Sequence, residues 1–284
     1  SPMDCAKGIG LAAANGRDVL DFEGLDQVPE PGPPLLCVPT TSGTGADVSQ
    51  FAIINDSARK VKIAIVSKKA IPDAALVDPL VTVSMPPELT AATGMDALVH
   101  AMEAYVSTAA SALTDLDALE AVRLVGANLP GAVADGGDLA KRSGMTLASL
   151  LAGRAFSNAS LGVVHAMAHA LGGALDLPHG VCNALLLEAA VAANYEAVPR
   201  RYADLESALA EGLGERPGGK LDSLLALIRR LKSAVGLDYG LARLGLDAKD
   251  VGSLAGYALR DACLVTNPRG FDRSGLEAIY VRAL

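Results

Sequence analysis

The spacing of apolar and polar positions changes character within the first third of the chain. Before residue 80, segments rich in Pro, Gly or Asn separate four short apolar runs, at 35–38, 49–54, 60–66 and 74–77. Short runs bounded by turn residues predict strands, and the two runs on either side of Asn55-Asp56-Ser57 predict a hairpin. The Ala-rich stretch Cys5–Asn15, which ends at Gly16, predicts a helix.

From Pro86 onward the apolar positions recur with a helical period. Pro86 and Pro87 suit the first turn of a helix, where the missing N–H is not needed. The same period predicts further helices over about 112–128, 138–156, 162–174, 181–194, 198–212, 220–235 and 248–260. The sequence therefore predicts a partial α/β domain over residues 1–85 and an all-helical domain over residues 86–284.

Composition agrees with this pattern and narrows the possible functions. The 284 residues are 51% apolar but only 4% aromatic, so Ala, Leu and Val must supply a core of closely packed helices. A chain of this length buries roughly three quarters of its unfolded surface, and a metal site would therefore serve function rather than hold the fold together. The net charge of -8 argues against a nucleic-acid partner.

The cysteines and the apolar runs bear on the cellular compartment. The four cysteines have no paired spacing, which favours buried, reduced thiols. No uninterrupted apolar run reaches the roughly 18 residues of a membrane span. We expect a cytoplasmic protein with no membrane partner.

The histidines are the most informative residues of the chain. All four fall between residues 100 and 179, and two of them, His165 and His169, are four positions apart. Asp96 and His100 have the same spacing, so each pair lies on one face of a helix. Pro178 must end the helix that carries His165 and His169, and His179 then approaches the same site from the turn that follows that helix. Imidazole and carboxylate ligands suit a divalent transition metal, which predicts one metal site.

Two further segments carry weaker signals. Residues 39–45, Pro-Thr-Thr-Ser-Gly-Thr-Gly, follow a predicted strand and could approach a phosphate or a nicotinamide ribose closely, although a solvated turn explains them equally well. The N-terminal segment 1–7 could present free N–H groups to an anion, but an ordinary capped helix has the same pattern.

Taken in order, these segments resemble the iron-containing (group III) alcohol dehydrogenases along nearly the whole chain. Ser1, Asp4, Ala6 and Lys7 match the end of the family motif Gly-Gly-Gly-Ser-x-x-Asp-x-Ala-Lys. The other matching segments are the threonine loop at 39–45, the two signatures at 91–98 and 162–180, and the C-terminal motif at 267–269. The resemblance implies a dehydroquinate synthase-like fold, with an incomplete Rossmann-like nucleotide-binding part followed by an all-α metal-binding domain.

Carried over by position, the resemblance also implies roles for individual residues. The metal ligands would be Asp96, His100, His165 and His179, while His169 matches a family histidine that lies near the nicotinamide and the substrate without binding the metal. Contacts to the nicotinamide half of the cofactor fall on Thr40, Thr41, Thr44, Ser49 (where the family has Thr) and Lys62. Contacts to the pyrophosphate and ribose fall on Ser1 and Asp4. Positions lining the substrate pocket are Phe51 and Phe156.

The implied activity is interconversion of an alcohol and an aldehyde or ketone by hydride transfer with NAD or NADP. The metal would be Fe²⁺, with Zn²⁺ as the alternative, and His169 would relay the proton. A homo-oligomer is expected from the family. Two alternatives stay open: a Zn-dependent polyol dehydrogenase or dehydroquinate synthase-like enzyme, and a truncated, non-catalytic metal-binding protein.

Overall fold

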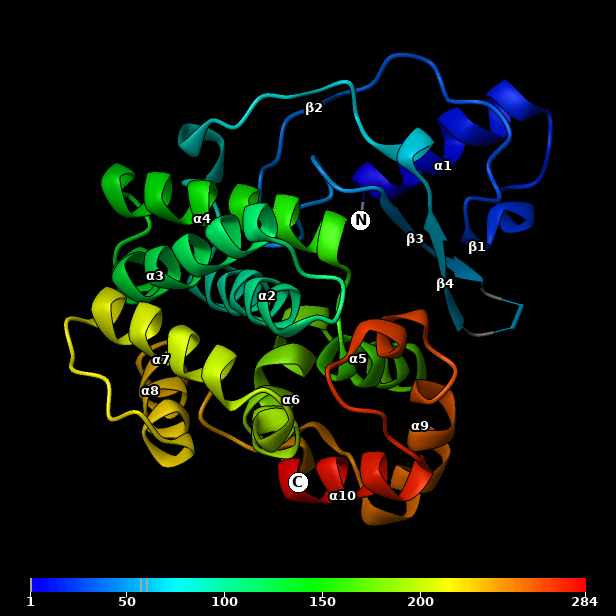
Figure 1. Ribbon diagram of the computed structural model, residues 1–284. Helices are drawn as coiled ribbons and strands as arrows, with labels where there is room; N and C mark the ends of the chain where they lie inside the picture. Colours follow the sequence, from blue (N-terminus) through cyan, green and yellow to red (C-terminus); the bar gives the residue numbers. More distant parts are fainter. Residues whose placement is uncertain (1, 57, 60) are drawn as a thin grey trace.

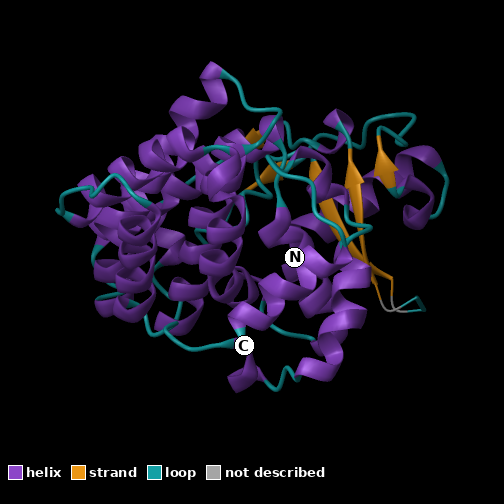
Figure 2. Cartoon of the chain, turned by 60° about the horizontal axis from the view of Figure 1, so that its bottom comes forward, coloured by secondary structure: helices purple, strands orange, loops and turns teal. Residues whose placement is uncertain are grey.

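The computed structural model describes residues 2–56, 58–59 and 61–284, and it places a small strand-containing part beside a larger body of helices (Figure 1). Figure 2 shows the strands gathered on one side of the molecule and the helices filling the other. This arrangement confirms the predicted combination of an α/β N-terminal part with an all-helical remainder.

The strands form two small sheets. β3 (Phe51–Asp56) and β4 (Val61–Val66) pair antiparallel, which confirms the predicted hairpin. β1 (Gly24–Leu25) joins β4 in parallel, and β2 (Leu36–Cys37) pairs in parallel with β5 (Ala74–Ala75). Helix α1 (Pro2–Asn15) packs on β3, and the buried side chains between them form a small core around Leu11, Phe22, Ile63 and Ile65.

The helical body starts at Pro87, close to its predicted start. Its helices are α2 (Pro87–Val106), α3 (Ala112–Ala134), α4 (Leu139–Ala159), α5 (Val163–Leu175), α6 (His179–Asn194), α7 (Pro199–Leu213), α8 (Leu221–Ala234), α9 (Val251–Ala258) and α10 (Arg273–Ala283). Among the described helices, none is long and apolar enough to cross a membrane alone. Together α4 and α5 reach that length and hydropathy, but the chain bends by 102° between them.

Two helices differ from the sequence-based expectation. α3 runs past the predicted end at residue 128 and contains Pro130, because its packing between α2, α4 and α7 outweighs the local cost of a proline. α10 was not predicted. Its buried residues Leu276, Ile279, Tyr280 and Ala283 do follow a helical spacing, and Asp272 caps its first turn.

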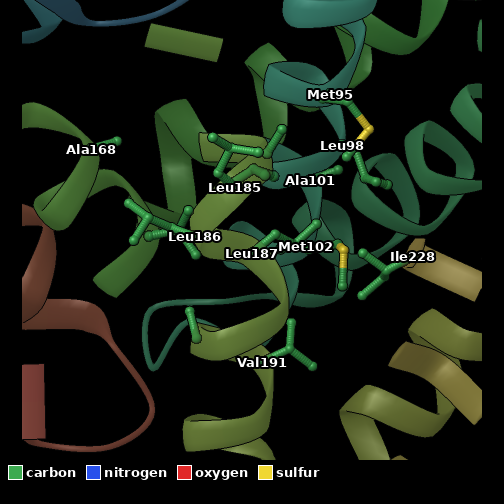
Figure 3. Close-up of a cluster of buried hydrophobic side chains, with 14 of the residues drawn as sticks. Met95, Leu98, Ala101, Met102, Ala168, Leu185, Leu186, Leu187, Val191 and Ile228 are labelled. Atoms are coloured by element: carbon green, nitrogen blue, oxygen red, sulfur yellow. The ribbon is translucent and has the colours of Figure 1, made fainter. Parts of the chain in front are cut away.

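Helix α2 lies at the centre of the main core. It is buried on nearly all sides and packs against α3, α4 and α6. Figure 3 shows Met95, Leu98 and Met102 of this helix among Leu185, Leu187 and other apolar side chains. Polar side chains on such a helix need partners, so those of α2 identify the site.

The two parts meet where the threonine loop lies against the helices. A Cβ on Gly43 would come within 2.6 Å of the backbone of Thr93 in α2. Gly45 has a φ of +58°, and a Cβ there would come within 2.6 Å of Gly153 in α4. No other residue allows such a close approach, and these two glycines therefore bring the loop up to the polar face of α2.

Candidate metal and cofactor site

Three helices bring the predicted metal-binding residues together. Asp96 and His100 lie one turn apart in α2, His165 lies in α5, and His179 is the first residue of α6. The Nε2 atoms of His165 and His179 are each 3.7 Å from Oδ1 of Asp96. His169 lies one turn after His165, and its ring stacks on that of His179 with 5.3 Å between the centroids. The two sequence segments thus form one cluster.

The Nδ1 atoms of three imidazoles have fixed acceptors. Nδ1 of His100 donates to the carbonyl of Gly43 at 3.2 Å, and Nδ1 of His165 donates to Glu103 at 2.6 Å. Nδ1 of His169 donates to Asp261 at 2.8 Å. Because Nδ1 carries the hydrogen in each ring, the lone pair of a neutral imidazole is on Nε2.

Asn183 completes the cluster and was not predicted. Its Nδ2 lies 2.6 Å from Oδ1 of Asp96 and 3.2 Å from Nε2 of both His165 and His179. Its Oδ1 is buried without a hydrogen-bond partner. Asn183 follows His179 by four positions in α6, and this spacing is the signal that could have identified it.

The donor set fits a divalent cation. Imidazole nitrogens and a carboxylate gather in a buried space, and these are ligand types that Fe²⁺ and Zn²⁺ accept. A second group of potential ligands, His169, Asp261 and Cys263, lies beside it. Burial and the neighbouring Asp261 raise the pKa of the Cys263 thiol, which disfavours the thiolate that a metal needs.

The charges within the cluster stabilise one another. Burial alone would raise the pKa of Asp96, but His100, His179 and His165 hold it well below its usual range. Burial would likewise lower the pKa of His165, yet the neighbouring carboxylates of Asp96 and Glu103 raise it to about 9. The pKa of His100 falls to about 4, mainly through burial. A cation bound at Nε2 of His165 would therefore compete with a proton for the same lone pair.

A cavity of about 620 Å³ opens from the cluster toward the hairpin and the threonine loop. His169 and Asp261 line it, as do Phe51 and Phe156, whose rings lie 5.6 Å apart. Phe156 also stacks on His100 with 4.4 Å between the centroids. The cavity thus has an apolar wall beside the polar cluster.

Most of the predicted cofactor-binding residues reach this cavity. Those that line it are Asp4, Thr44, Ser49 and Lys62. Thr40 and Thr41 belong to the same loop but are not among the described residues that line the cavity, and Ser1 lies outside the described residues. The cavity therefore joins the candidate metal-binding cluster to residues that match the predicted cofactor site.

Comparison with known proteins agrees with this geometry. Residues 1–79 match the iron-containing alcohol dehydrogenases, and residues 90–284 match the C-terminal part of the Fe-containing alcohol dehydrogenase family. The chain therefore belongs to the iron-containing alcohol dehydrogenase family. It is an oxidoreductase of alcohols, and the expected family, fold and reaction class are confirmed.

Individual relatives are similar along the whole chain. The 1,3-propanediol dehydrogenase of Klebsiella pneumoniae is 42% identical, with 100% of this chain and 73% of the relative covered. The NAD-dependent methanol dehydrogenase of Bacillus methanolicus is 40% identical, with coverage of 95% and 71%. A crystal structure of 1,3-propanediol oxidoreductase superposes with a TM-score of 0.95 at 42% identity and covers 100% of this chain and 75% of that one.

Proposed function

We propose that this protein interconverts a small alcohol and its aldehyde by hydride transfer with NAD, at an iron site formed by Asp96, His100, His165 and His179. The convergence of these four side chains from α2, α5 and α6 is the observation that carries the proposal. Family membership favours Fe²⁺, and Zn²⁺ suits the same donor set.

The ion supplies Lewis acidity that makes a nearby hydroxyl more acidic or a carbonyl more electrophilic. The side chains of the protein position the substrate. Phe51 and Phe156 hold the carbon skeleton of the substrate and exclude water on one side of the cavity. Because this wall is apolar, we infer a short, uncharged alcohol as the substrate.

His169 would move the proton. Its Nδ1–H is donated to Asp261, which leaves Nε2 free to accept a proton from the substrate hydroxyl. The side chain of His169 is 16% exposed, whereas that of His165 is 1% exposed, so only His169 of these two can exchange that proton with solvent.

The cofactor would occupy the hairpin side of the cavity. The hydroxyls of Thr44 and Ser49 and the ammonium group of Lys62 can hold its nicotinamide half. Thr40 and Thr41, in the same loop, are proposed as further contacts on the basis of the family resemblance. Asp4 and Ser1 would contact the pyrophosphate and ribose of the cofactor. The NAD-dependent methanol dehydrogenase among the relatives favours NAD over NADP.

We also infer where and with what the protein acts. All four cysteines are free, which agrees with a reducing, cytoplasmic compartment, and a net charge of -8 disfavours nucleic acid and anionic membrane surfaces as partners. A homo-oligomer is proposed from the family, and light scattering of the purified protein would test it.

Two histidine variants test the site. His179→Ala should lose both bound metal and NAD-linked turnover. His169→Ala should keep the metal and lose roughly a hundredfold or more in kcat, since general acid–base groups contribute about 10²–10⁴-fold. Metal content by elemental analysis, together with kcat, separates the two roles. A His179→Ala protein that retained both metal and turnover would refute the proposal.

A further inference from the structure

Glu103 is a buried carboxylate that no metal-binding role described so far requires. It lies in α2, three residues after His100 and seven after Asp96, so the three side chains share one face of the helix. Its exposed fraction is 5%, and burying a charge at this depth is unfavourable without compensating partners.

Its partners are at the start of α5. The Glu103 side chain accepts the backbone N–H of Gly162 at 3.0 Å and that of Val164 at 2.6 Å. It also accepts Nδ1–H of His165 at 2.6 Å. Gly162 is the N-cap of α5 and has no side chain of its own to cap the helix, so the carboxylate from α2 takes that place.

The close approach depends on Gly162. A Cβ at this position would lie 2.9 Å from Oε1 of Glu103 and 2.8 Å from Oδ1 of Asn267. Any side chain would push the carboxylate away from α5. The register of α5 against α2, and with it the position of His165, is therefore set by this contact.

We propose that Glu103 is a positioning residue of the metal site: its carboxylate holds His165 with the hydrogen on Nδ1, so that Nε2 faces the cation. This inference rests on the proposed metal site. The carboxylate both selects the tautomer and fixes the ring plane, because one oxygen binds Nδ1–H while the other is held by the helix N-terminus.

A purely structural cap would have the same backbone contacts, and the chain contains such a cap for comparison. Glu206 in α7 is 1% exposed and accepts the backbone N–H of Gly218 at 2.7 Å and of Gly219 at 3.0 Å. It also accepts the hydroxyl of Ser223 at 2.5 Å, and among the described residues it makes no hydrogen bond with a histidine. Glu206→Gln is therefore a matched control for Glu103→Gln.

The glutamine substitution keeps size and removes one acceptor. If its NH₂ group faces His165, Nδ1 must accept and the hydrogen moves to Nε2, where it blocks the cation. If its oxygen faces His165 instead, the NH₂ group meets the N–H of Val164. We expect Glu103→Gln to bind Zn²⁺ about 10–100-fold more weakly than the wild type, the usual range for such partners, and Glu206→Gln to bind Zn²⁺ as the wild type does.

Zn²⁺ affinity should be measured by competition with a chromophoric chelator on the full chain. The ¹⁵N–¹H spectrum of the zinc-loaded proteins gives a second readout. In the wild type and in Glu206→Gln, Nδ1–H of His165 should be strongly downfield because it is bonded to a carboxylate. In Glu103→Gln that resonance should move upfield.

A folded Glu103→Gln protein with wild-type Zn²⁺ affinity and an unmoved Nδ1–H resonance overturns the proposal. If Glu103→Gln does not fold, Glu103→Asp is tested instead, because aspartate keeps the charge but holds it one methylene farther from His165. Wild-type Zn²⁺ affinity in Glu103→Asp would also overturn the proposal. A wild-type protein that binds no Zn²⁺ or Fe²⁺ refutes the metal site itself, which is a different result.

Discussion

At the scale of single residues, the site depends on the side chains behind the imidazoles as much as on the imidazoles themselves. His100, His165 and His169 each donate Nδ1–H to a fixed oxygen, from Gly43, Glu103 and Asp261 in turn. A fixed acceptor at Nδ1 orients the ring and determines its tautomer before a metal ion or a substrate binds. Substitutions at these acceptors should therefore affect function without touching a ligand.

Asp261→Asn tests this at His169, the proposed proton relay. The remaining amide oxygen can still accept the N–H of Cys263, which Asp261 caps at 2.8 Å, but the NH₂ group now faces His169 and favours the wrong tautomer. We expect kcat to fall by about 10–100-fold, a part of the relay's contribution, with metal content unchanged. Steady-state kinetics and elemental analysis measure both. An unchanged kcat would show that the orientation of His169 does not matter.

The sequence predicted candidate ligands but not the side chains that support them. Asp96 with His100, and His165 with His169, could be paired because four-residue spacing places two side chains on one helix face. The spacing does not reveal what packs opposite that face. Glu103 is 62 residues from His165 and Asp261 is 92 residues from His169. Neither partnership could be read from one sequence.

At the scale of elements, Lys7 ties α1 to the start of β3. Its buried ammonium group donates to the carbonyls of Ser49 at 2.7 Å and Phe51 at 2.9 Å. Burial lowers the pKa of Lys7 from 10.5 to about 8, against the opposing effect of Asp4, Cys37 and Asp47. Between these values the unfolded chain binds more protons than the folded one.

The contribution of Lys7 to the free energy of unfolding should therefore increase as the pH rises from 8 to about 10. Urea unfolding of the wild type and of Lys7→Met at several pH values isolates this contribution as the difference between the two proteins. A difference that stays flat or decreases over this range would contradict a depressed pKa.

The contact between α6 and α2 depends on a glycine. A Cβ at Gly180 would lie 2.2 Å from the carbonyl oxygen of Ala92, so Gly180→Ala must push α6 away from α2. Because His179 and Asp96 lie on these two helices, we expect both a lower melting temperature and weaker Zn²⁺ binding.

Gly256→Ala is the matched control for this variant. Gly256 lies inside α9, and its Cβ would have no neighbour within 4 Å. An alanine there should stabilise the helix by roughly 0.5–1 kcal/mol and leave Zn²⁺ binding unchanged. Equal changes in melting temperature for Gly180→Ala and Gly256→Ala would contradict the explanation that the close contact between α6 and α2 requires Gly180.

Strong periodicity predicted most elements, and the exceptions have physical causes. The strands β2 to β5 and the helices α2 and α4 to α8 were expected close to their observed bounds, whereas the two-residue strand β1 was not predicted. Pro130 favoured an earlier end for α3, because a sequence does not show that three other helices pack against this segment. α10 is short, and its helical spacing covers only three turns.

At the scale of the whole molecule, the proposed ion would join α2, α5 and α6, which are otherwise held by packing. Binding at a free concentration 100 times Kd adds about 2.7 kcal/mol to the stability. For a chain of this size that is a rise of about 4–5 °C in the melting temperature. Calorimetric scans with and without a chelator measure it. His179→Ala, scanned in the same way, should show almost no dependence on the chelator.

The close contact between the threonine loop and α2 has a thermodynamic consequence for the whole enzyme. The carbonyl of Gly43, in the loop proposed to hold the nicotinamide, accepts the hydrogen of a proposed metal ligand, His100. If His100 holds the ion through Nε2, its Nδ1–H would become a stronger donor to the carbonyl of Gly43 and would stabilise the loop in this position. Metal and cofactor would then raise each other's affinity by the same factor, because linkage between two binding sites is reciprocal.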